Sequence, residues 1–552
     1  MSDQLLSVEA RVPDSLQAAV QDKLALAEQA GVAERLRAQD ATLWGPAGTP
    51  EVENRLGWLT IAERMLADLG SVEAFAEEVR TEGIADVVLL GMGGSSLAPE
   101  VLRRSFGARA DGPRLHVLDS TDAEVIRATE GAVDLARTLF IVSSKSGGTI
   151  EPLSLFAHFW SLREDGRSFA AITDPGSGLA ELASERGFRR TFAGDPNIGG
   201  RYSALSAFGI VPGALMGIDV RGLLTAAPSA WDTRLSDAVA AGGSMSAEPA
   251  GVWMGAALSA LARAGRDKLT FVIPQSLPGL GLWLEQLVAE STGKRSTGIL
   301  PVAEEPLGDA DAYGEDRVFA YLRDVSSPDP ELDDRVGELA DAGHPVVTVP
   351  TRGPQDLGRL FLLWELAVAV VGWGLEINPF DQPNVQQAKD ATKRVLAEYE
   401  SSGSLPEVAD GEEAAVRSLL LDSRPPEYVA IMAYTRPAAD LDEAAAELRA
   451  AVRQATRATT TFGYGPRYLH STGQFHKGGP KTGRFLQLMH DGPSDVDIPG
   501  APYTFTTLKH AQAIGDLNTL RELGRPAERV TLAGEDPAGA LRALTAKIKE
   551  PT

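Results

Sequence analysis

The sequence predicts an α/β protein in which short parallel strands alternate with helices. Apolar runs of strand length recur along the chain, and segments with helical periodicity separate them. Two of these runs end in glycine- or serine-rich turns, as strands that lead into helices often do. At roughly 100–200 residues per domain, the length of 552 residues predicts two to four domains.

The elements fall into a lead-in and a first α/β domain. Residues 1–45 are predicted to be a helical lead-in, because apolar residues recur at intervals of three and four in LQAAVQDKLALAEQAGVAERL. Residues 46–227 are predicted to form one doubly wound domain, since their apolar runs suit a parallel sheet covered on both faces. The predicted strands are Ile84–Leu90, Leu115–Leu118, Thr138–Val142 and Phe169–Ile172.

A second α/β domain is predicted over residues 248–400, after a connection at Pro228–Ala247. Its predicted strands are Leu269–Ile273, Arg317–Leu322 and Pro345–Val349, and its predicted helices are Leu282–Glu290 and Asp356–Val371. The apolar run Phe361–Leu375 contains Glu365 and is too short to span a bilayer, so it is interpreted as a buried helix.

A C-terminal α/β block is predicted over residues 420–552, after the acidic linker SSGSLPEVADGEE. Its predicted strands are Tyr428–Ala433 and Phe485–Met489, and its predicted helices are Ala438–Ala458 and Leu508–Leu523. A structural or dimer-forming role is the default expectation for this block.

Composition excludes several classes of function. The net charge of −24 disfavours binding to nucleic acid or to an anionic membrane surface. The absence of cysteine excludes disulfides, cysteine-ligated metals and thiolate nucleophiles. The first residues, MSDQLLSVEARVPDSLQ, do not resemble a signal peptide, so we expect a soluble cytoplasmic protein.

Two strand-to-helix turns are candidates for phosphate binding. Gly91–Ser96 (GMGGSS) follows one predicted strand, and Ser143–Thr149 (SSKSGGT) follows another. Glycines let backbone N–H groups approach an anion, and hydroxyls with a lysine supply further donors. The alternative for each turn is an ordinary capped connection. No GKS or GKT follows the glycines, so nucleotide hydrolysis is poorly supported.

Five motifs in order resemble those of glucose-6-phosphate isomerases. They are GMGGSSLAPE, SSKSGGTIEP, GGRYSALS, AESTGK and NPFDQPNVQQAK, and they cover roughly residues 50–400. The pattern is most similar to the actinobacterial type, like the isomerase part of transaldolase–isomerase fusions. The resemblance implies two sugar-isomerase (SIS) subdomains with a site between them. It also implies glycolytic and gluconeogenic interconversion of glucose 6-phosphate and fructose 6-phosphate through a cis-enediolate, without metal or redox cofactor.

The resemblance also implies roles for individual residues. The family's phosphate cradle corresponds to Ser144, Lys145, Ser146 and Thr149, and Gly94 and Ser95 are expected near the sugar. Gly148 stands where many relatives have threonine.

The chemistry of an aldose–ketose isomerase is expected to depend on four groups in these motifs. Glu290 corresponds to the base that moves a proton between C2 and C1. Arg201 is expected to stabilise the enediolate charge. Lys389 corresponds to the lysine that assists ring opening, and Gln382 is expected to contact the substrate.

The ring-opening histidine of the family is missing from its usual place, because no histidine lies between Glu290 and His344. His344 heads a predicted strand and is interpreted as structural. His476 is the preferred candidate and His470 its rival, both within LHSTGQFHKGGPKTG, and a role for neither stays open. In this family a histidine often completes the neighbouring subunit's site, so a homodimer is expected.

Three alternatives to a dedicated glucose-6-phosphate isomerase make different demands on the chain. A dual phosphoglucose/phosphomannose isomerase would differ in side-chain volume near the C2 hydroxyl. A non-catalytic sugar-phosphate-binding module would not need Glu290, Arg201 and Lys389 together. An aminosugar synthase normally needs a cysteine nucleophile, which this chain lacks.

Overall fold

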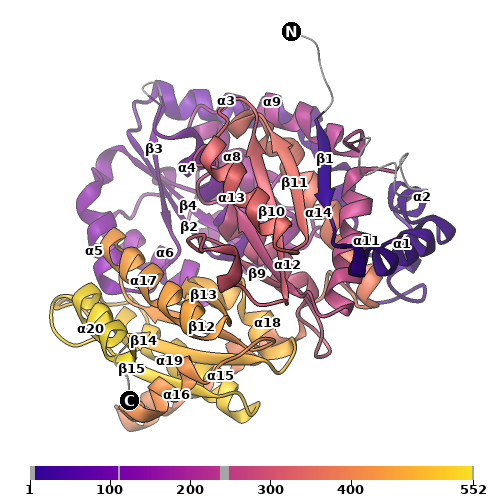
Figure 1. Cartoon of the computed structure of the whole chain (residues 1–552). Coiled ribbons are helices and arrows are strands. Elements are labelled where there is room, and N and C mark those ends of the chain that lie inside the picture. The colour runs from indigo at the N-terminus through magenta and orange to yellow at the C-terminus, as the bar shows by residue number, and fades with distance from the viewer. Residues whose placement is uncertain (1–5, 110–111, 237–247, 550–552) are drawn as a thin grey trace.

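The computed structural model describes residues 6–109, 112–236 and 248–549, and it confirms the predicted α/β class. Three separate sheets, each largely parallel, form the framework of the molecule (Figure 1). Their strands follow one another along the chain, apart from one N-terminal strand that joins the second sheet.

The first sheet contains the four strands predicted for this region and one more at its edge. Its strands are β2 (Asp86–Gly91), β3 (Arg114–Leu118), β4 (Thr138–Ser143), β5 (Phe169–Thr173) and β6 (Arg190–Ala193). They are parallel, in the order β3-β2-β4-β5-β6. The helices of this region are α3 (Ile61–Thr81), α4 (Leu97–Phe106), α5 (Ala123–Ala132), α6 (Ile150–Leu162), α7 (Gly178–Glu185), α8 (Ala207–Leu215) and α9 (Val220–Ala226).

The second sheet has six strands in the order β7-β1-β11-β10-β8-β9. Its strands are β1 (Ser7–Arg11), β7 (Arg234–Leu235), β8 (Lys268–Val272), β9 (Leu300–Val302), β10 (Arg317–Asp324) and β11 (Val346–Thr351). The helices nearest in sequence are α1 (Asp14–Gln29), α2 (Val32–Arg37), α11 (Ala250–Arg263), α12 (Leu280–Thr292), α13 (Pro330–Asp341) and α14 (Leu357–Leu375). Part of the predicted connection, residues 237–247, lies outside the described residues.

The N-terminal lead-in was predicted to be helical, but the structure shows that it also contains a strand. Before α1 and α2 the chain forms β1, which pairs antiparallel with β11 and so extends the second sheet. Only five residues form this strand, too few for their alternation to stand out from the helical pattern that follows. Val8 is fully buried on the sheet, which explains why this segment is held in place.

The C-terminal block contains a third parallel sheet in the order β13-β12-β14-β15. Its strands are β12 (Tyr428–Tyr434), β13 (Thr459–Tyr464), β14 (Gly483–Met489) and β15 (Ala527–Thr531). Its helices, with the helix that leads into it, are α15 (Pro383–Ser402), α16 (Glu413–Leu421), α17 (Ala439–Thr456), α18 (Gly473–Gly478), α19 (Phe505–Glu522) and α20 (Pro537–Lys549).

In all three sheets the connections between strands change direction in the same way. The chain passes from a central strand to one neighbour and then crosses to the opposite neighbour, as in β2, β3 and β4. The triplets β8-β9-β10 and β12-β13-β14 repeat this arrangement. The place where successive connections go to opposite sides is called a switch point. The loops that leave the carboxyl ends of the two strands beside it diverge, and ligands of α/β proteins bind in the crevice between these loops. In the first sheet this crevice lies between β2 and β4, the two strands that precede the predicted phosphate-binding turns.

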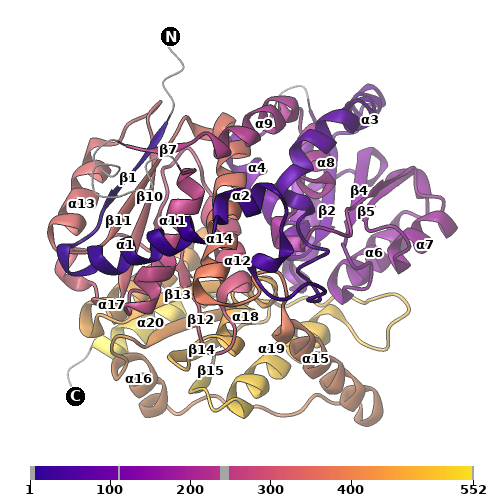
Figure 2. The ribbon, with the colours of Figure 1, turned by 90° about the vertical axis from the view of Figure 1, so that its right-hand side faces the viewer.

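Helices of the C-terminal block complete the core of the first sheet. Alternate residues of β2 point to opposite faces, so Val87 and Val88 belong to different apolar clusters. The cluster that contains Val88 also contains Val395 of α15 and Phe505 of α19. The third sheet therefore cannot be treated as an appended tail, and the domain boundaries given above stay a prediction. Figure 2 shows α15 and α19 beneath the first sheet.

Helix α14 contains the apolar run Phe361–Leu375, and it is buried as predicted. By length and composition Gly353–Leu375 could cross a membrane, but nearly all of it is buried inside the fold. In Figures 1 and 2 it runs through the interior, and it packs against α11 and α12. Its environment is that of a core helix.

Glu365 is an ionisable residue in the middle of α14. It is fully buried, and neither carboxyl oxygen has a hydrogen-bonding partner among the described residues. Burial raises the pKa of Glu365 well above its ordinary 4.5. The folded state therefore holds a proton that the unfolded chain releases as the pH rises above about 4.5, and each pH unit above this value costs up to roughly 1.4 kcal/mol of stability.

We expect Glu365→Gln to remove this cost. The thermal unfolding midpoint of the variant, measured relative to wild type, should rise progressively as the pH is raised from 5 to 8. Glu376→Gln is the control, because the Glu376 side chain is 81% exposed beside Arg263 and should show no such trend. A constant difference between Glu365→Gln and wild type across this range would contradict a buried, protonated Glu365.

Candidate active site

Glu290 lies in the last turn of α12, a helix that is buried along nearly its whole length. Its Oε2 accepts hydrogen bonds from Arg201 Nη1 and Gln286 Nε2, each at 3.4 Å. Burial is the largest influence on Glu290 and raises the pKa of its carboxyl, although the charges of Arg201 and His470 oppose the shift. A carboxylate with a raised pKa is a better proton acceptor than an exposed one.

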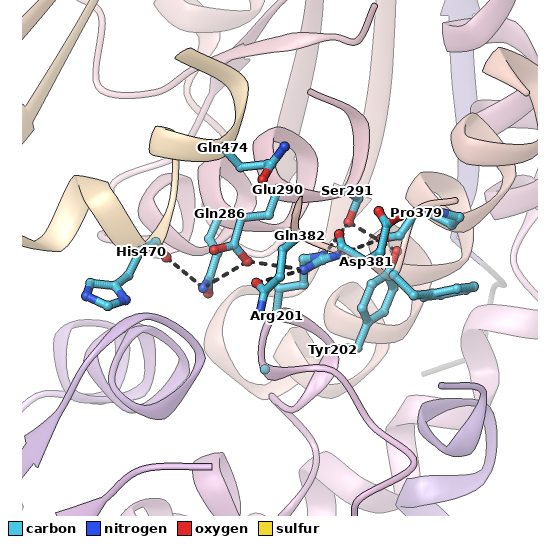
Figure 3. A network of polar contacts seen from close by, with 12 residues as sticks. Arg201, Tyr202, Gln286, Glu290, Ser291, Pro379, Asp381, Gln382, His470 and Gln474 are labelled. Atoms are coloured by element: carbon cyan, nitrogen blue, oxygen red, sulfur yellow. Dashed lines mark hydrogen bonds and ion pairs between the residues drawn. The ribbon is translucent and has the colours of Figure 1, made fainter. Parts of the chain in front are cut away.

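Arg201 connects this carboxylate, on α12, to the loop that precedes α15. It lies in a short 3-10 helix, η6 (Gly200–Tyr202), and its side chain is 2% exposed. All five N–H donors of its guanidinium have partners. Nε donates to Ser291 Oγ at 2.9 Å, Nη2 to the carbonyls of Pro379 and Asp381 at 2.7 and 2.9 Å, and Nη1 to Glu290 and Gln382 at 3.4 and 3.5 Å (Figure 3).

These distances divide the guanidinium into two functional parts. The bonds from Nη2 and Nε are short and anchor the group, whereas the two from Nη1 are near the limit of hydrogen bonding. Nη1 is therefore the nitrogen that a bound oxyanion could engage at the least cost.

Lys294 holds the same segment that Arg201 anchors. Its Nζ donates to the carbonyls of Asn378 and Asp381 at 2.5 and 2.6 Å and forms an ion pair with the Asp381 carboxylate. Burial, reinforced by the charge of Arg201, lowers the pKa of Lys294 to about 7. Two buried cations thus fix the loop that precedes α15, the helix carrying Lys389.

Gln286 lies one turn before Glu290 and faces the same space. Besides Glu290, its Nε2 donates to the backbone carbonyl of His470 at 2.8 Å, and within the described chain its buried Oε1 has no partner. Gly93 of the first glycine turn lies against the same groups, because a Cβ there would be 2.8 Å from Gln286 Nε2 and 2.9 Å from the His470 carbonyl. Its φ of +54° also favours glycine.

The side chain of His470 forms a pair with a buried carboxylate. Its Nε2 is 2.9 Å from Oε1 of Glu151, which also accepts a hydrogen bond from Gln512 at 2.7 Å. Burial acts to lower the pKa of His470, but the charge and hydrogen bond of Glu151 outweigh it, and the pKa is raised. Lys389 is close enough for its charge to act on both members of the pair.

The two predicted phosphate-binding turns are adjacent. β2 and β4 are neighbouring parallel strands, so Gly91–Ser96 and Ser143–Thr149 leave the same edge of the sheet. Ser143 Oγ donates to the Ser95 carbonyl at 3.1 Å, which connects the two turns. A Cβ on Gly94 would collide with the Gly200 carbonyl, so the first turn also packs directly against the segment that carries Arg201.

Within the second turn the side chains differ in accessibility. Ser144 is buried and its Oγ donates to Thr149 Oγ1 at 3.3 Å, whereas Ser146 is exposed. Lys145 forms an ion pair with Asp174, which lies directly after β5. Thr149 is the N-cap residue of α6 and its hydroxyl makes no capping hydrogen bond, so the first N–H groups of α6 lack a side-chain cap.

Comparison with known proteins decides the family. The phosphoglucose isomerase profile matches residues 31–306, half of the chain. A glucose-6-phosphate isomerase of Trichormus variabilis is 30% identical over 390 residues, covering 61% of this chain and 72% of the relative. One from Rubrobacter xylanophilus is 30% identical over 372 residues, covering 57% of this chain and 84% of that relative. The chain belongs to the phosphoglucose isomerase family.

Solved structures agree with this assignment at the level of the fold. A glucose-6-phosphate isomerase of Chlamydia trachomatis has a TM-score of 0.55 at 18% identity, covering 71% of this chain and 87% of its own. A hypothetical protein of Thermus thermophilus has a TM-score of 0.57 at 26% identity, covering 70% of this chain and all of its own. The phosphoglucose isomerase match itself ends at residue 306, before Gln382, Lys389 and both candidate histidines.

His476 lies in a different environment from that of His470. It is buried in α18, and its Nδ1 is 3.0 Å from the hydroxyl of Tyr428. Tyr428 and Phe485 pack against its ring. Burial, with the charges of Lys477 and Arg525, lowers the pKa of His476 to about 3. These contacts are typical of a neutral core histidine, whereas His470 has a carboxylate partner and lies beside Gln286.

Other residues of the candidate site were missed by the sequence analysis. Gln286 precedes Glu290 by four residues and could have been found from helical spacing alone. Glu151 lies two residues after the Ser143–Thr149 turn, but no local pattern indicates its pairing with a histidine 319 residues away. Ser291 and Lys294 belong to the AESTGK motif, yet their partners come from distant segments.

We expect Glu151→Gln to lower the pKa of His470. The amide retains the size of the carboxyl but removes its charge, so burial would dominate and bring the pKa below the ordinary 6.5. Nuclear magnetic resonance titration of histidine-labelled protein would measure the shift, with Glu181→Gln on the exposed surface of α7 as control. An unchanged His470 titration would mean that Glu151 does not govern its protonation.

Proposed function

We propose that this chain is a glucose-6-phosphate isomerase that interconverts glucose 6-phosphate and fructose 6-phosphate through a cis-enediolate. Membership of the phosphoglucose isomerase family supports the reaction. The observation that carries the proposal is the buried Glu290 carboxylate, held between Arg201 and Gln286. A sugar-phosphate-binding module would have no need to bury a base of raised pKa beside a fixed cation.

Glu290 is the proposed proton carrier. One carboxylate can reach both C1 and C2 of an open-chain sugar, so it removes the proton from one carbon and returns it to the other. Negative charge then develops on the C1 and C2 oxygens. Arg201 Nη1 is held by the anchored guanidinium beside Glu290, and a cation fixed in advance stabilises that charge without reorganising.

Substrate positioning is assigned to groups around this pair. The unpartnered Gln286 Oε1 can accept a hydrogen bond from a sugar hydroxyl. Gln382, bonded to Arg201 Nη1, can exchange that contact for one to the substrate. The turn with Ser144, Lys145, Ser146 and Thr149 is proposed to bind the phosphate, and Gly94 and Ser95 to lie beside the sugar.

His470, rather than His476, is the proposed ring-opening histidine. Glu151 holds Nε2 and raises the pKa of His470, which leaves a protonated imidazole whose Nδ1 is available to the ring oxygen. Lys389, whose charge acts on the same pair, is the proposed second cation for this step. Because His470 belongs to the C-terminal block, this block would complete the site of its own chain.

Other expectations remain proposals. We propose a cytoplasmic homodimer, and activity on mannose 6-phosphate stays an alternative. No cofactor is proposed. Within residues 6–109, 112–236 and 248–549 no cluster of three histidine, aspartate or glutamate side chains is arranged to bind a metal ion.

Replacing Glu290 by glutamine tests the base. We expect conversion of fructose 6-phosphate by wild type in the presence of EDTA, and a loss of about 10²–10⁴-fold in kcat for Glu290→Gln. Glu285→Gln is the matched control, because Glu285 is also buried on α12 and burial raises its pKa to about 8. An equal loss in both variants would indicate damage to α12 instead of removal of a base.

Comparing His470→Ala with His476→Ala tests the ring-opening assignment. His470→Ala should lose activity on the cyclic sugar phosphate while keeping it on an open-chain analogue, because only the cyclic substrate needs ring opening. His476→Ala should lower the thermal unfolding midpoint through loss of the Tyr428 contact, with similar effects on both substrates. The reverse pattern would restore His476 as the catalytic histidine.

A further inference from the structure

Gln474 is a buried amide in α18 whose hydrogen bonds reach two other helices of the candidate site. It lies above Glu290 in the view of Figure 3. Its Nε2 donates to the Gly293 carbonyl at the end of α12 and to Asn384 Oδ1 in the first turn of α15, both at 2.9 Å. Its Oε1 accepts the backbone N–H of Asn384 at 3.0 Å. One side chain therefore ties the end of one helix to the start of another.

The start of α15 needs this bond because its own N-cap residue does not cap it. The first N–H groups of a helix have no partner within the helix, and a side chain at the N-cap position usually accepts one of them. In α15 this residue is Gln382, whose side chain makes no such bond. Pro383 follows and has no N–H, so Asn384 carries the first of these donors. Gln474 supplies the acceptor from a segment 90 residues further along the chain.

A cap that comes from α18 leaves the side chain of Gln382 to the active site. The atom of Gln382 that would accept a capping bond is Oε1, and it instead accepts a hydrogen bond from Arg201 Nη1 at 3.5 Å. Lys389 lies in the second turn of the same helix. The position and rotation of α15 therefore decide where both of these side chains lie relative to α12.

Two glycines allow α18 to approach both helices closely. A Cβ on Gly293 would be 2.4 Å from the Cα of Phe475. A Cβ on Gly478 would be 2.6 Å from both the Gly293 carbonyl oxygen and Asn384 Oδ1. Both distances are steric clashes, so the close contact of α18 with the ends of α12 and α15 requires glycine at these positions.

We infer that Gln474 is a positioning residue, which caps α15 from outside the helix and aligns it with α12. Glu290 lies three residues before Gly293, one of the two anchors of the amide. Loss of the amide would let α15, with Gln382 and Lys389, move relative to the base. The catalytic consequence rests on the proposed function, whereas the capping does not.

A purely structural contact would have a different signature. Loss of such a contact lowers the fraction of folded protein, which reduces the rates on every substrate by the same factor. Displacement of α15 moves Lys389, which is proposed to act only in ring opening. The ratio of activity on a cyclic substrate to activity on an open-chain substrate therefore separates the two roles.

Replacing Gln474 by methionine tests the inference, because methionine keeps the length of the side chain and removes its hydrogen bonds. The substrates are fructose 6-phosphate and 5-deoxyfructose 6-phosphate, which lacks the hydroxyl that closes the ring. Gln474→Met should lower the ratio of kcat/KM for the cyclic to the open-chain substrate by roughly 10- to 100-fold, since a catalytic group misplaced by about 1 Å can cost that much. Hydrogen exchange at the start of α15, measured by mass spectrometry, should become faster.

Gln487→Met is the matched control. Gln487 is a buried glutamine of β14 whose Nε2 donates to the Ala513 carbonyl and whose Oε1 accepts from Arg529, both at 2.9 Å. Neither partner belongs to α12 or α15. This variant should lower the thermal unfolding midpoint and leave both the substrate ratio and the exchange at α15 as in wild type.

Each outcome decides one part of the inference. Equal losses on both substrates in Gln474→Met, or faster exchange with an unchanged ratio, would overturn the positioning role, and unchanged exchange would overturn the cap. If Gln474→Met does not fold, Asn384→Ala takes its place, because it removes only the Oδ1 acceptor and should lower the ratio in the same direction. No conversion of fructose 6-phosphate by wild type would reject the proposed function, and the exchange measurement would still decide the cap.

Discussion

The buried guanidinium of Arg201 joins parts of the chain that are far apart in sequence. Taking a charge out of water costs several kcal/mol unless its hydrogen-bonding capacity is satisfied. All five donors are used, on α12 and on the loop before α15, so the relative position of these segments is constrained. Glu290, on the same helix as one anchor, is held at the guanidinium by the same requirement.

A second consequence concerns the loop that leads into α15. Carbonyl oxygens of Asn378, Pro379 and Asp381 all point at cations, and that of Asp381 is shared between Arg201 and Lys294. Burial, reinforced by the repulsion of Arg201, lowers the pKa of Lys294, although the carboxylates of Asp381 and Glu290 oppose the shift. These contacts hold the stretch of backbone that leads to Gln382 and Lys389.

The C-terminal block has a larger part in the site than a dimer-forming role would require. Its helices complete the apolar core of the first sheet, and Arg467 is bound by Asp119 in the first region of the chain. These contacts place the 3-10 helix η10 (Arg467–His470) against Gln286 and Glu151. No histidine lies between Glu290 and His344 in sequence, and the histidine proposed for ring opening comes from the C-terminal block of the same chain.

The sequence by itself determined the α/β class, the predicted strands of the first sheet and the two glycine- and serine-rich turns, because hydrophobic periodicity and turn chemistry are local. It also identified Arg201, Glu290 and Gln382, which the structure brings into contact. Only the tertiary structure distinguished His470 from His476, since six residues separate them in sequence while their environments differ in charge. A carboxylate 319 residues away raises one pKa, and an aromatic core lowers the other. The same holds for the short strand β1 and for the pairing of Arg467 with Asp119, because their partners are distant in the chain. A local sequence pattern carries no information about a partner that comes close only when the chain folds.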